Sequence, residues 1–86
     1  MATISGLALY QYMSCPYCAL VRSTMDRLGL EVEMRDTLQQ PEYAEEVWSN
    51  TGRGTVPVLR IESEEGEVRW LPESRDIIRY LEERFG

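Results

Sequence analysis

Apolar residues recur along the first half of this chain with two different periods, and these periods predict three elements. Residues 7–12 form an apolar run typical of a buried strand, and residues 30–35 alternate apolar and charged, as in a strand with one buried face. Between them, residues 16–28 have a helical period that stops at Gly29. A strand, a helix and a strand in this order predict a right-handed parallel unit. The apolar side of the helix is expected to consist of Leu20, Val21, Met25 and Leu28.

Pro41 predicts the start of a second helix, because proline suits the first helical position, where its missing N–H costs nothing. The helix is expected over about 41–49 and is followed by a turn at 50–54. Its inward side is expected to consist of Ala44, Val47 and Trp48.

The last third of the chain predicts a hairpin and a final helix. Residues 55–61 and 67–70 are typical of strands, and the polar turn at 62–66 predicts that they pair antiparallel. A helix over about 74–84 follows, with Ser74 as its N-cap. Its apolar side is expected to consist of Ile77, Ile78, Leu81 and Phe85.

Together these elements predict an α/β fold in the order βαβ, α, ββα. Helices would cover the two faces of a four-stranded mixed sheet. The chain of 86 residues allows one domain, spanning 1–86, with residues 1–6 as a lead-in.

Composition and charge limit the kinds of protein that this chain could be. The hydrophobic fraction of 43% is that of an ordinary globular chain, and the net charge of −6 argues against a nucleic-acid-binding surface. The chain has no His, which excludes a histidine general base or metal ligand. Neither a basic and apolar leader nor a run of transmembrane length is visible. We therefore expect a cytoplasmic monomer that contacts no membrane.

The candidate chemistry lies in Cys15 and Cys18, the two cysteines of the chain. They stand at the predicted boundary between a strand and a helix, where unpaired N–H groups and the helix macrodipole stabilise a thiolate. Pro16 fits the first helical turn. A spacing of three residues places both thiols on one helix face, within reach of a disulfide. We expect redox chemistry, with Cys15 as the exposed nucleophile and Cys18 as the more buried resolving thiol.

Other uses of the cysteine pair are less consistent with the sequence. The plainest alternative is two small buried residues or a structural disulfide. A structural zinc ion takes four ligands, whereas the chain offers two Cys and no His. A c-type haem requires His directly after the second cysteine, where this chain has Ala19. No metal is therefore expected.

Three separated pieces of the sequence resemble one superfamily. They are the tetrapeptide Cys-Pro-Tyr-Cys at 15–18, the run Gly-Arg-Gly-Thr-Val-Pro at 52–57, and Pro-Glu-Ser at 72–74. Over about residues 7–84 the chain resembles a dithiol glutaredoxin of the thioredoxin-fold superfamily, and it is also similar to the N-terminal domain of a glutathione transferase. The resemblance implies a thioredoxin-like fold and glutathione as co-substrate.

The resemblance also implies how glutathione would be held. The residue matching Pro57 is a cis proline, and the backbone of the residue before it, here Val56, pairs with the cysteinyl part of glutathione. Arg53 matches a basic position that faces the glycine carboxylate. Ser74 matches a position whose backbone N–H binds the γ-glutamyl carboxylate at a helix N-terminus, and Glu73 would face the γ-glutamyl amino group.

Most of these positions also have a plainer interpretation. For Pro57 it is a proline at the start of a strand. Tyr17 is expected to be half-exposed and to line the ligand groove, and the alternative is packing against the second helix. Arg53 could be a solvated turn residue, and Glu73 and Ser74 could simply cap the last helix.

Two departures from the glutaredoxin pattern stand out. Tyr12 occupies a position where many glutaredoxins have Lys, which removes one source of thiolate stabilisation and of glutathione binding. Pro72 and Glu73 replace the usual Gly-Gly before the last helix, as in the transferases. The chain therefore combines a glutaredoxin active site with a transferase-like third motif.

The resemblance implies a glutathione-dependent thiol–disulfide oxidoreductase, with a role in electron transport and cell redox homeostasis. It would reduce protein–glutathione mixed disulfides and protein disulfides, so its partners would be glutathione and proteins that carry such bonds. One alternative is a glutathione-binding domain related to the glutathione transferases. Another is an iron–sulfur carrier that bridges a cluster between two copies, for which Pro16 is unfavourable.

Overall fold

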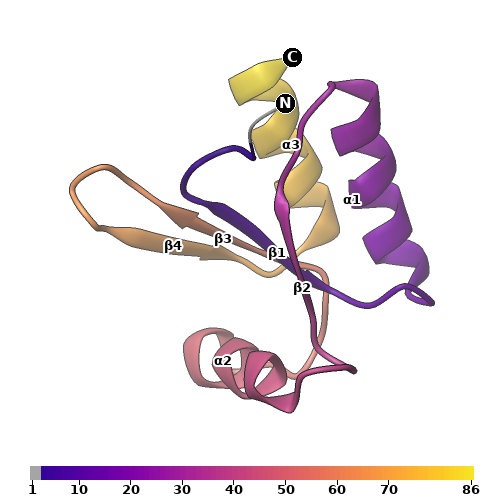
Figure 1. Ribbon diagram of the computed structural model, residues 1–86, viewed down its shortest axis with the longest axis vertical. Helices are drawn as coiled ribbons and strands as arrows, with labels where there is room; N and C mark the ends of the chain where they lie inside the picture. Colours follow the sequence, from indigo (N-terminus) through magenta and orange to yellow (C-terminus); the bar gives the residue numbers. More distant parts are fainter. Residues whose placement is uncertain (1–2) are drawn as a thin grey trace.

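The computed structural model describes residues 3–86, which contain three helices and four strands in the order that the sequence predicts (Figure 1). Met1 and Ala2, where the expected lead-in and the expected 1–86 domain begin, lie outside the described residues. The elements are β1 (Leu7–Gln11), α1 (Pro16–Arg27), β2 (Glu33–Asp36), α2 (Pro41–Thr51), β3 (Val58–Glu62), β4 (Val68–Leu71) and α3 (Ser74–Phe85).

The strands form one mixed sheet in the order β2-β1-β3-β4. β1 pairs in parallel with β2 and antiparallel with β3, and β3 pairs antiparallel with β4. The predicted parallel unit and the predicted antiparallel hairpin are therefore both confirmed. The topology is that of the thioredoxin-like α/β fold.

The two faces of the sheet have separate cores. Helices α1 and α3 cover one face and α2 lies over the other (Figure 1). Because side chains alternate along β1, Leu7 and Leu9 pack with α1 and α3, whereas Ala8 and Tyr10 pack under α2. The larger core also includes Val21, Met25, Val32, Leu59, Ile77 and Leu81, and the smaller one Val47 and Val58.

Two apolar residues of the first half are exposed, contrary to the expected pattern. Leu20 is 56% exposed, because α1 turns Cys18, Val21 and Met25 inward, and these occupy one stripe of the helix that excludes Leu20. Met34 lies in the edge strand β2 and is also exposed. The buried side of this helix was therefore predicted correctly except at Leu20, since the half-buried Leu28 packs against the larger core.

The inward side of α2 differs from the prediction. Trp48 is 62% exposed and Ala44 is exposed too, so both expectations are wrong. The helix instead presents Tyr43 and Val47 to the sheet. These two residues are four positions apart, so they lie on one face, and Trp48 follows a further 100° around the helix.

Several element starts differ from the prediction. β2 begins at Glu33 rather than at residue 30, and β4 begins at Val68 rather than at 67. Ser74 is the first residue of α3 and Glu73 is its N-cap, so the predicted N-cap is wrong by one position. The Glu73 side chain makes no capping hydrogen bond, and its carboxylate pairs with Arg53 instead. β3 begins at Val58, later than predicted, because Pro57 has no N–H to offer to the ladder.

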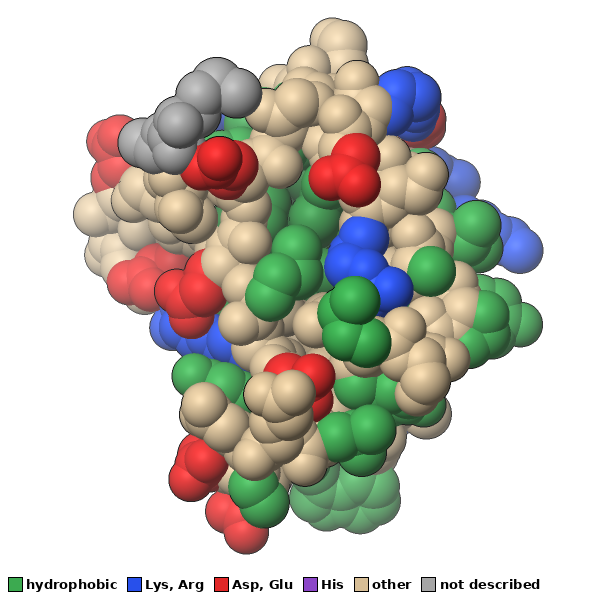
Figure 2. All heavy atoms as spheres, turned by 45° about the vertical axis from the view of Figure 1, so that its right-hand side comes forward, with side chains coloured by type: hydrophobic (Ala, Val, Ile, Leu, Met, Phe, Trp, Pro, Cys, Tyr) green, Lys and Arg blue, Asp and Glu red, His purple; other side chains and the backbone are tan. Residues whose placement is uncertain are grey.

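The surface carries charges of both signs. In Figure 2, acidic side chains are scattered mainly over the left of the view, and no continuous basic surface is visible on this face.

The helices are short, with 11 or 12 residues each. Within residues 3–86, none has the length and apolar character needed to cross a membrane.

Candidate active site

The cysteine pair stands where the chain leaves the central strand and enters α1. Cys15 is the N-cap of α1, and Pro16 follows at the first helical position. The backbone N–H of Cys18 donates to the Cys15 Sγ at 3.3 Å. Both residues are free cysteines. The predicted placement of the pair at a helix N-terminus is confirmed, and the Cys15 sulfur takes up one of the N–H groups that the first turn leaves unpaired.

Both thiols are buried. Cys15 is 5% exposed, so the expectation of an exposed nucleophile is wrong; its thiol turns toward the carbonyl oxygen of Val56, with 3.8 Å between the two atoms. Cys18 is fully buried, as expected of the resolving thiol. Burial, together with the hydrogen bond between the two thiols, raises the pKa of Cys18 to about 12. Cys18 therefore keeps its proton at neutral pH.

Arg22 of α1 contacts the loop in front of the cysteines, and the sequence analysis did not single it out. Its guanidinium donates to the side-chain oxygen of Gln11, to the carbonyl of Tyr12 at 3.5 Å and to that of Met13 at 3.3 Å. Its charge acts on Cys18 as well, opposing part of the rise in that pKa. The available signal was spacing, since Arg22 lies four residues after Cys18 and so on the same helix face. A cation is thus present near the dithiol although Tyr12 replaces the lysine of many glutaredoxins.

The Val56–Pro57 peptide bond is cis, as the resemblance implies. Pro57 is buried directly before β3, and the carbonyl of Val56 accepts the hydrogen bond from Cys15. The bend at these residues therefore lies beside the thiol, although the two are far apart in sequence.

A cavity of about 700 Å³ lies next to this bend. It brings together all the residues that the resemblance assigns to glutathione binding: Tyr17, Arg53, Val56, Pro57, Glu73 and Ser74. Thr55, Pro72, Arg75 and Asp76 complete the lining. Cys15 itself does not line the cavity, but its thiol contacts the carbonyl of Val56, which does. Tyr17 is 61% exposed, so its predicted place at the rim of a groove agrees with the structure.

The N-terminus of α3 forms one wall of the cavity. Ser74, Arg75 and Asp76 belong to its first turn, where backbone N–H groups have no partner inside the helix. Such a turn favours a carboxylate. Beside it, the guanidinium of Arg53 pairs with the carboxylate of Glu73, and both side chains are about half-exposed. The cavity therefore carries groups of both signs and suits a zwitterionic ligand.

Among residues 3–86, no group of three or more Cys, Asp or Glu side chains is placed to hold a metal ion.

The fold and the site define a class: a thioredoxin-fold domain that carries a dithiol at the start of its first helix beside a cavity of mixed charge. The chain belongs to the family described as glutathione S-transferase, N-terminal domain, whose model matches residues 9–86.

Individual relatives agree with this assignment. Glutaredoxin 2 of Escherichia coli strain K12 is 31% identical over 80 residues, covering 93% of this chain and 34% of the relative. Maleylacetoacetate isomerase of Anaeromyxobacter dehalogenans, solved with bound GSH in its active site, is 30% identical with a TM-score of 0.71, covering 93% of this chain and 38% of that protein. Glutathione S-transferase isozyme E7 of Drosophila melanogaster is 27% identical with the same TM-score, at 93% and 35% coverage. The chain spans about a third of the length of the curated relatives it matches.

Proposed function

We propose that this chain is a glutathione-dependent thiol–disulfide oxidoreductase that acts through Cys15 and Cys18. The observation that carries the proposal is the position of the Cys15 thiol. It caps a helix N-terminus and contacts the carbonyl of Val56, a residue of the cavity that holds the expected glutathione-binding groups. The GSH bound to the maleylacetoacetate isomerase relative supports the choice of ligand.

In the proposed cycle, the Cys15 thiolate attacks the glutathione sulfur of a protein–glutathione mixed disulfide. A new bond forms between Cys15 and glutathione, the old disulfide breaks, and the protein thiolate leaves and takes a proton from water. The thiolate of a second glutathione then attacks the adduct, which restores Cys15 and releases glutathione disulfide. With a protein disulfide as substrate, the Cys15 thiolate attacks one of its sulfurs, and the other leaves as a thiolate. Cys18 then attacks the resulting Cys15–protein disulfide, which releases the reduced protein and leaves a Cys15–Cys18 disulfide.

The cavity offers a partner for each end of glutathione. The first turn of α3 at Ser74 would bind the γ-glutamyl carboxylate and Glu73 the amino group beside it. Arg53 would bind the glycine carboxylate, and the backbone at Val56 would pair with the cysteinyl unit and hold its sulfur near Cys15.

A second candidate function is glutathione binding without redox turnover, in a transferase-like role. The observation that favours it is the transferase-like arrangement at 72–74, together with the family that the chain belongs to. In this case glutathione would occupy the same cavity, and the reacting sulfur would be that of glutathione rather than of Cys15.

Turnover of a glutathionylated test protein separates the two functions. Under the proposal, Cys15→Ser abolishes glutathione-dependent deglutathionylation, while Cys18→Ser retains substantial activity because a second glutathione can complete the cycle. Wild-type turnover by Cys15→Ser would exclude the mechanism. Conjugation of glutathione to an aryl halide by the Cys15→Ser variant, without deglutathionylation by the wild type, would instead establish the transferase-like role.

A further inference from the structure

Helix α2 is held to the sheet differently from the other helices. α1 and α3 lie together over the larger core, whereas α2 lies alone on the opposite face (Figure 1). The buried residue of α2 is Val47, with Tyr43 packed beside it and partly buried. By contrast, α1 buries Cys18, Val21, Thr24 and Met25. Apart from these apolar contacts and the edge-to-face contact of Tyr43 with the Tyr10 ring, polar groups also attach α2 to the sheet.

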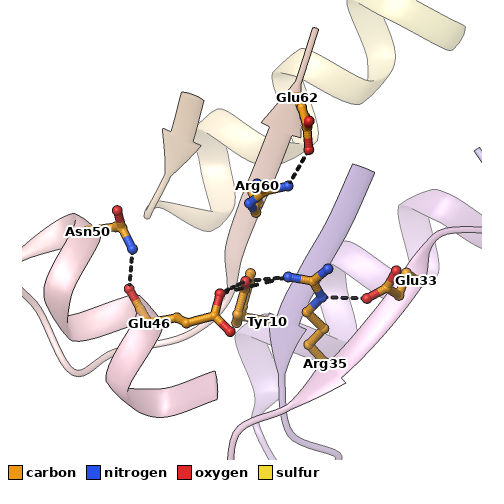
Figure 3. Close-up of polar contacts among 7 residues, drawn as sticks. All are labelled: Tyr10, Glu33, Arg35, Glu46, Asn50, Arg60 and Glu62. Atoms are coloured by element: carbon orange, nitrogen blue, oxygen red, sulfur yellow. Dashed lines mark hydrogen bonds and ion pairs between the residues drawn. The ribbon is translucent and has the colours of Figure 1, made fainter. Parts of the chain in front are cut away.

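These polar groups meet at Tyr10, a fully buried residue of β1 (Figure 3). Its hydroxyl donates to Glu46 Oε2 at 2.8 Å and accepts from Arg35 Nη1 at 2.6 Å. Arg35 Nη1 also lies 3.9 Å from Glu46 Oε2. The three residues come from β1, α2 and β2, so the network ties the helix to two strands.

Arg35 is central to this network. Its guanidinium carbon lies 5.3 Å from the centre of the Tyr10 ring and 5.6 Å from that of Tyr43, within the range of cation–π contacts. Arg35 also donates a hydrogen bond to the carboxylate of Glu33, and the Arg35 side chain is 21% exposed. Loss of one member of such a partly buried network leaves the others without partners, so it should loosen α2 as a whole.

The end of α2 leads directly into the candidate site. Its last residue, Thr51, donates through Oγ1 to the carbonyl of Val47 at 2.7 Å and accepts from the backbone N–H of Arg53 at 3.2 Å. Gly52, in the left-handed conformation with φ of 70°, ends the helix between them. Arg53 and Val56 then line the cavity. A displacement of α2 must therefore carry this loop with it.

We propose that Tyr10, Arg35 and Glu46 are positioning residues for the glutathione site. By anchoring α2 to β1 and β2, they hold the loop that presents Arg53 and Val56 to the ligand. None of the three lines the cavity, so their effect on the ligand passes through α2 and Thr51. The effect on glutathione rests on the proposed function, whereas the effect on the loop does not.

Minimal substitutions test the inference. Tyr10→Phe keeps the ring and removes the hydroxyl, and Arg35→Met keeps an unbranched apolar stem and removes the guanidinium with its charge. Both should raise the KM for glutathione by about threefold to tenfold, while kcat stays within about twofold. Glu46→Gln keeps an acceptor for the hydroxyl of Tyr10, so it should restore most of the affinity that Glu46→Ala loses.

Arg60→Met is the matched control. Arg60 also pairs with a carboxylate, that of Glu62 at 2.9 Å (Figure 3). Its guanidinium carbon lies 5.9 Å from the centre of the Trp70 ring, and both partners belong to β3 and β4. The control should leave the KM for glutathione unchanged. If Arg35→Met and Tyr10→Phe behave like this control, or lower kcat in step with binding, the inference is overturned.

Amide hydrogen exchange without ligand keeps the test independent of the proposed function. In Arg35→Met, the amides of α2 and of the loop up to Val56 should exchange faster than in the wild type and in Arg60→Met, while those of α1 keep their rates. If the wild type shows no dependence on glutathione, the proposed function fails, and this exchange pattern alone decides the inference. Acceleration confined to α2 and the loop up to Val56 supports it, and uniform or absent acceleration overturns it.

Discussion

Arg53 and Glu73 form an ion pair across the candidate glutathione cavity, joining the loop after α2 to the N-cap of α3. Under the proposed function, each of them would bind an oppositely charged group of glutathione. The ligand would therefore exchange one ion pair for two, with its own carboxylate on Arg53 and its own ammonium on Glu73. The pairing also keeps both side chains at the cavity before the ligand arrives.

Removal of the Arg53 charge should weaken glutathione binding more than it affects the thiol. We expect Arg53→Ala to raise the KM for glutathione by about tenfold, as for loss of one charge-assisted hydrogen bond, with little change in Cys15 alkylation. Arg27→Ala is the control, because Arg27 makes a comparable exposed pair with Glu82 at 2.7 Å between α1 and α3. Steady-state kinetics at varied glutathione measure the effect, and equal KM values for the two variants would remove Arg53 from the site.

Arg22→Met should destabilise the fold, because Gln11 is a buried residue whose side-chain oxygen accepts from Arg22. An amide left without its partner costs about 1–3 kcal/mol. Chemical denaturation measures this loss. Adding Gln11→Leu should recover part of it, since the orphaned amide is then removed. Purely additive losses in the double variant would show that the two side chains do not depend on each other.

Alkaline pH should destabilise the protein through Tyr10 and Cys18. Burial raises the pKa of Tyr10 from 10.0 to about 12, with the hydrogen bond to Glu46 adding to the effect, and the pKa of Cys18 rises from 9.0 to about 12. Between these values the unfolded chain loses protons that the folded chain keeps, so the free energy of unfolding falls as pH rises from 9 toward 12. Denaturation at several pH values should show a shallower decline for Tyr10→Phe. Equal slopes for this variant and the wild type would contradict the assignment.

Gly6→Ala should be more damaging than Gly29→Ala. Both glycines have positive φ, 86° and 70°, so alanine would be strained at either position. At Gly6, however, an added Cβ would lie 2.4 Å from the carbonyl oxygen of Glu62, whereas it would meet no atom within 4 Å at Gly29. We expect a loss of about 1 kcal/mol for Gly29→Ala and clearly more for Gly6→Ala, measured as a fall in unfolding free energy. Equal losses in the two variants would show that the backbone near Glu62 shifts to make room for the added Cβ.

Local patterns and motifs predicted most of the fold and which residues belong to the candidate site. The strand before Cys15, the helix after it and the hairpin after Pro57 each have a signature within a few residues, and those signatures were confirmed. The resemblance predicted that Arg53 and Ser74 belong to one site, because the sequence around either residue gives no indication of the other.

What could not be predicted depends on how elements rotate against one another. Trp48 and Val47 are adjacent apolar residues of a helix with few others, so periodicity could not decide which one faces the sheet. The burial of Cys15 follows from the approach of Val56, a residue 41 positions away. The polar roles of Arg22 and Arg35 have the same origin, because an arginine in sequence carries no mark of the acceptors that folding will bring to it.

The proton held by Cys18 has a consequence for timing in the proposed cycle. Attack by Cys18 on a Cys15–glutathione adduct needs a thiolate, and burial, the largest cause of the raised pKa of Cys18, disfavours that thiolate at neutral pH. The adduct should therefore persist long enough for a second glutathione to reach it. The balance between the one-cysteine and the two-cysteine route would then follow the supply of free glutathione, so the same molecule would favour different products in glutathione-rich and glutathione-poor surroundings.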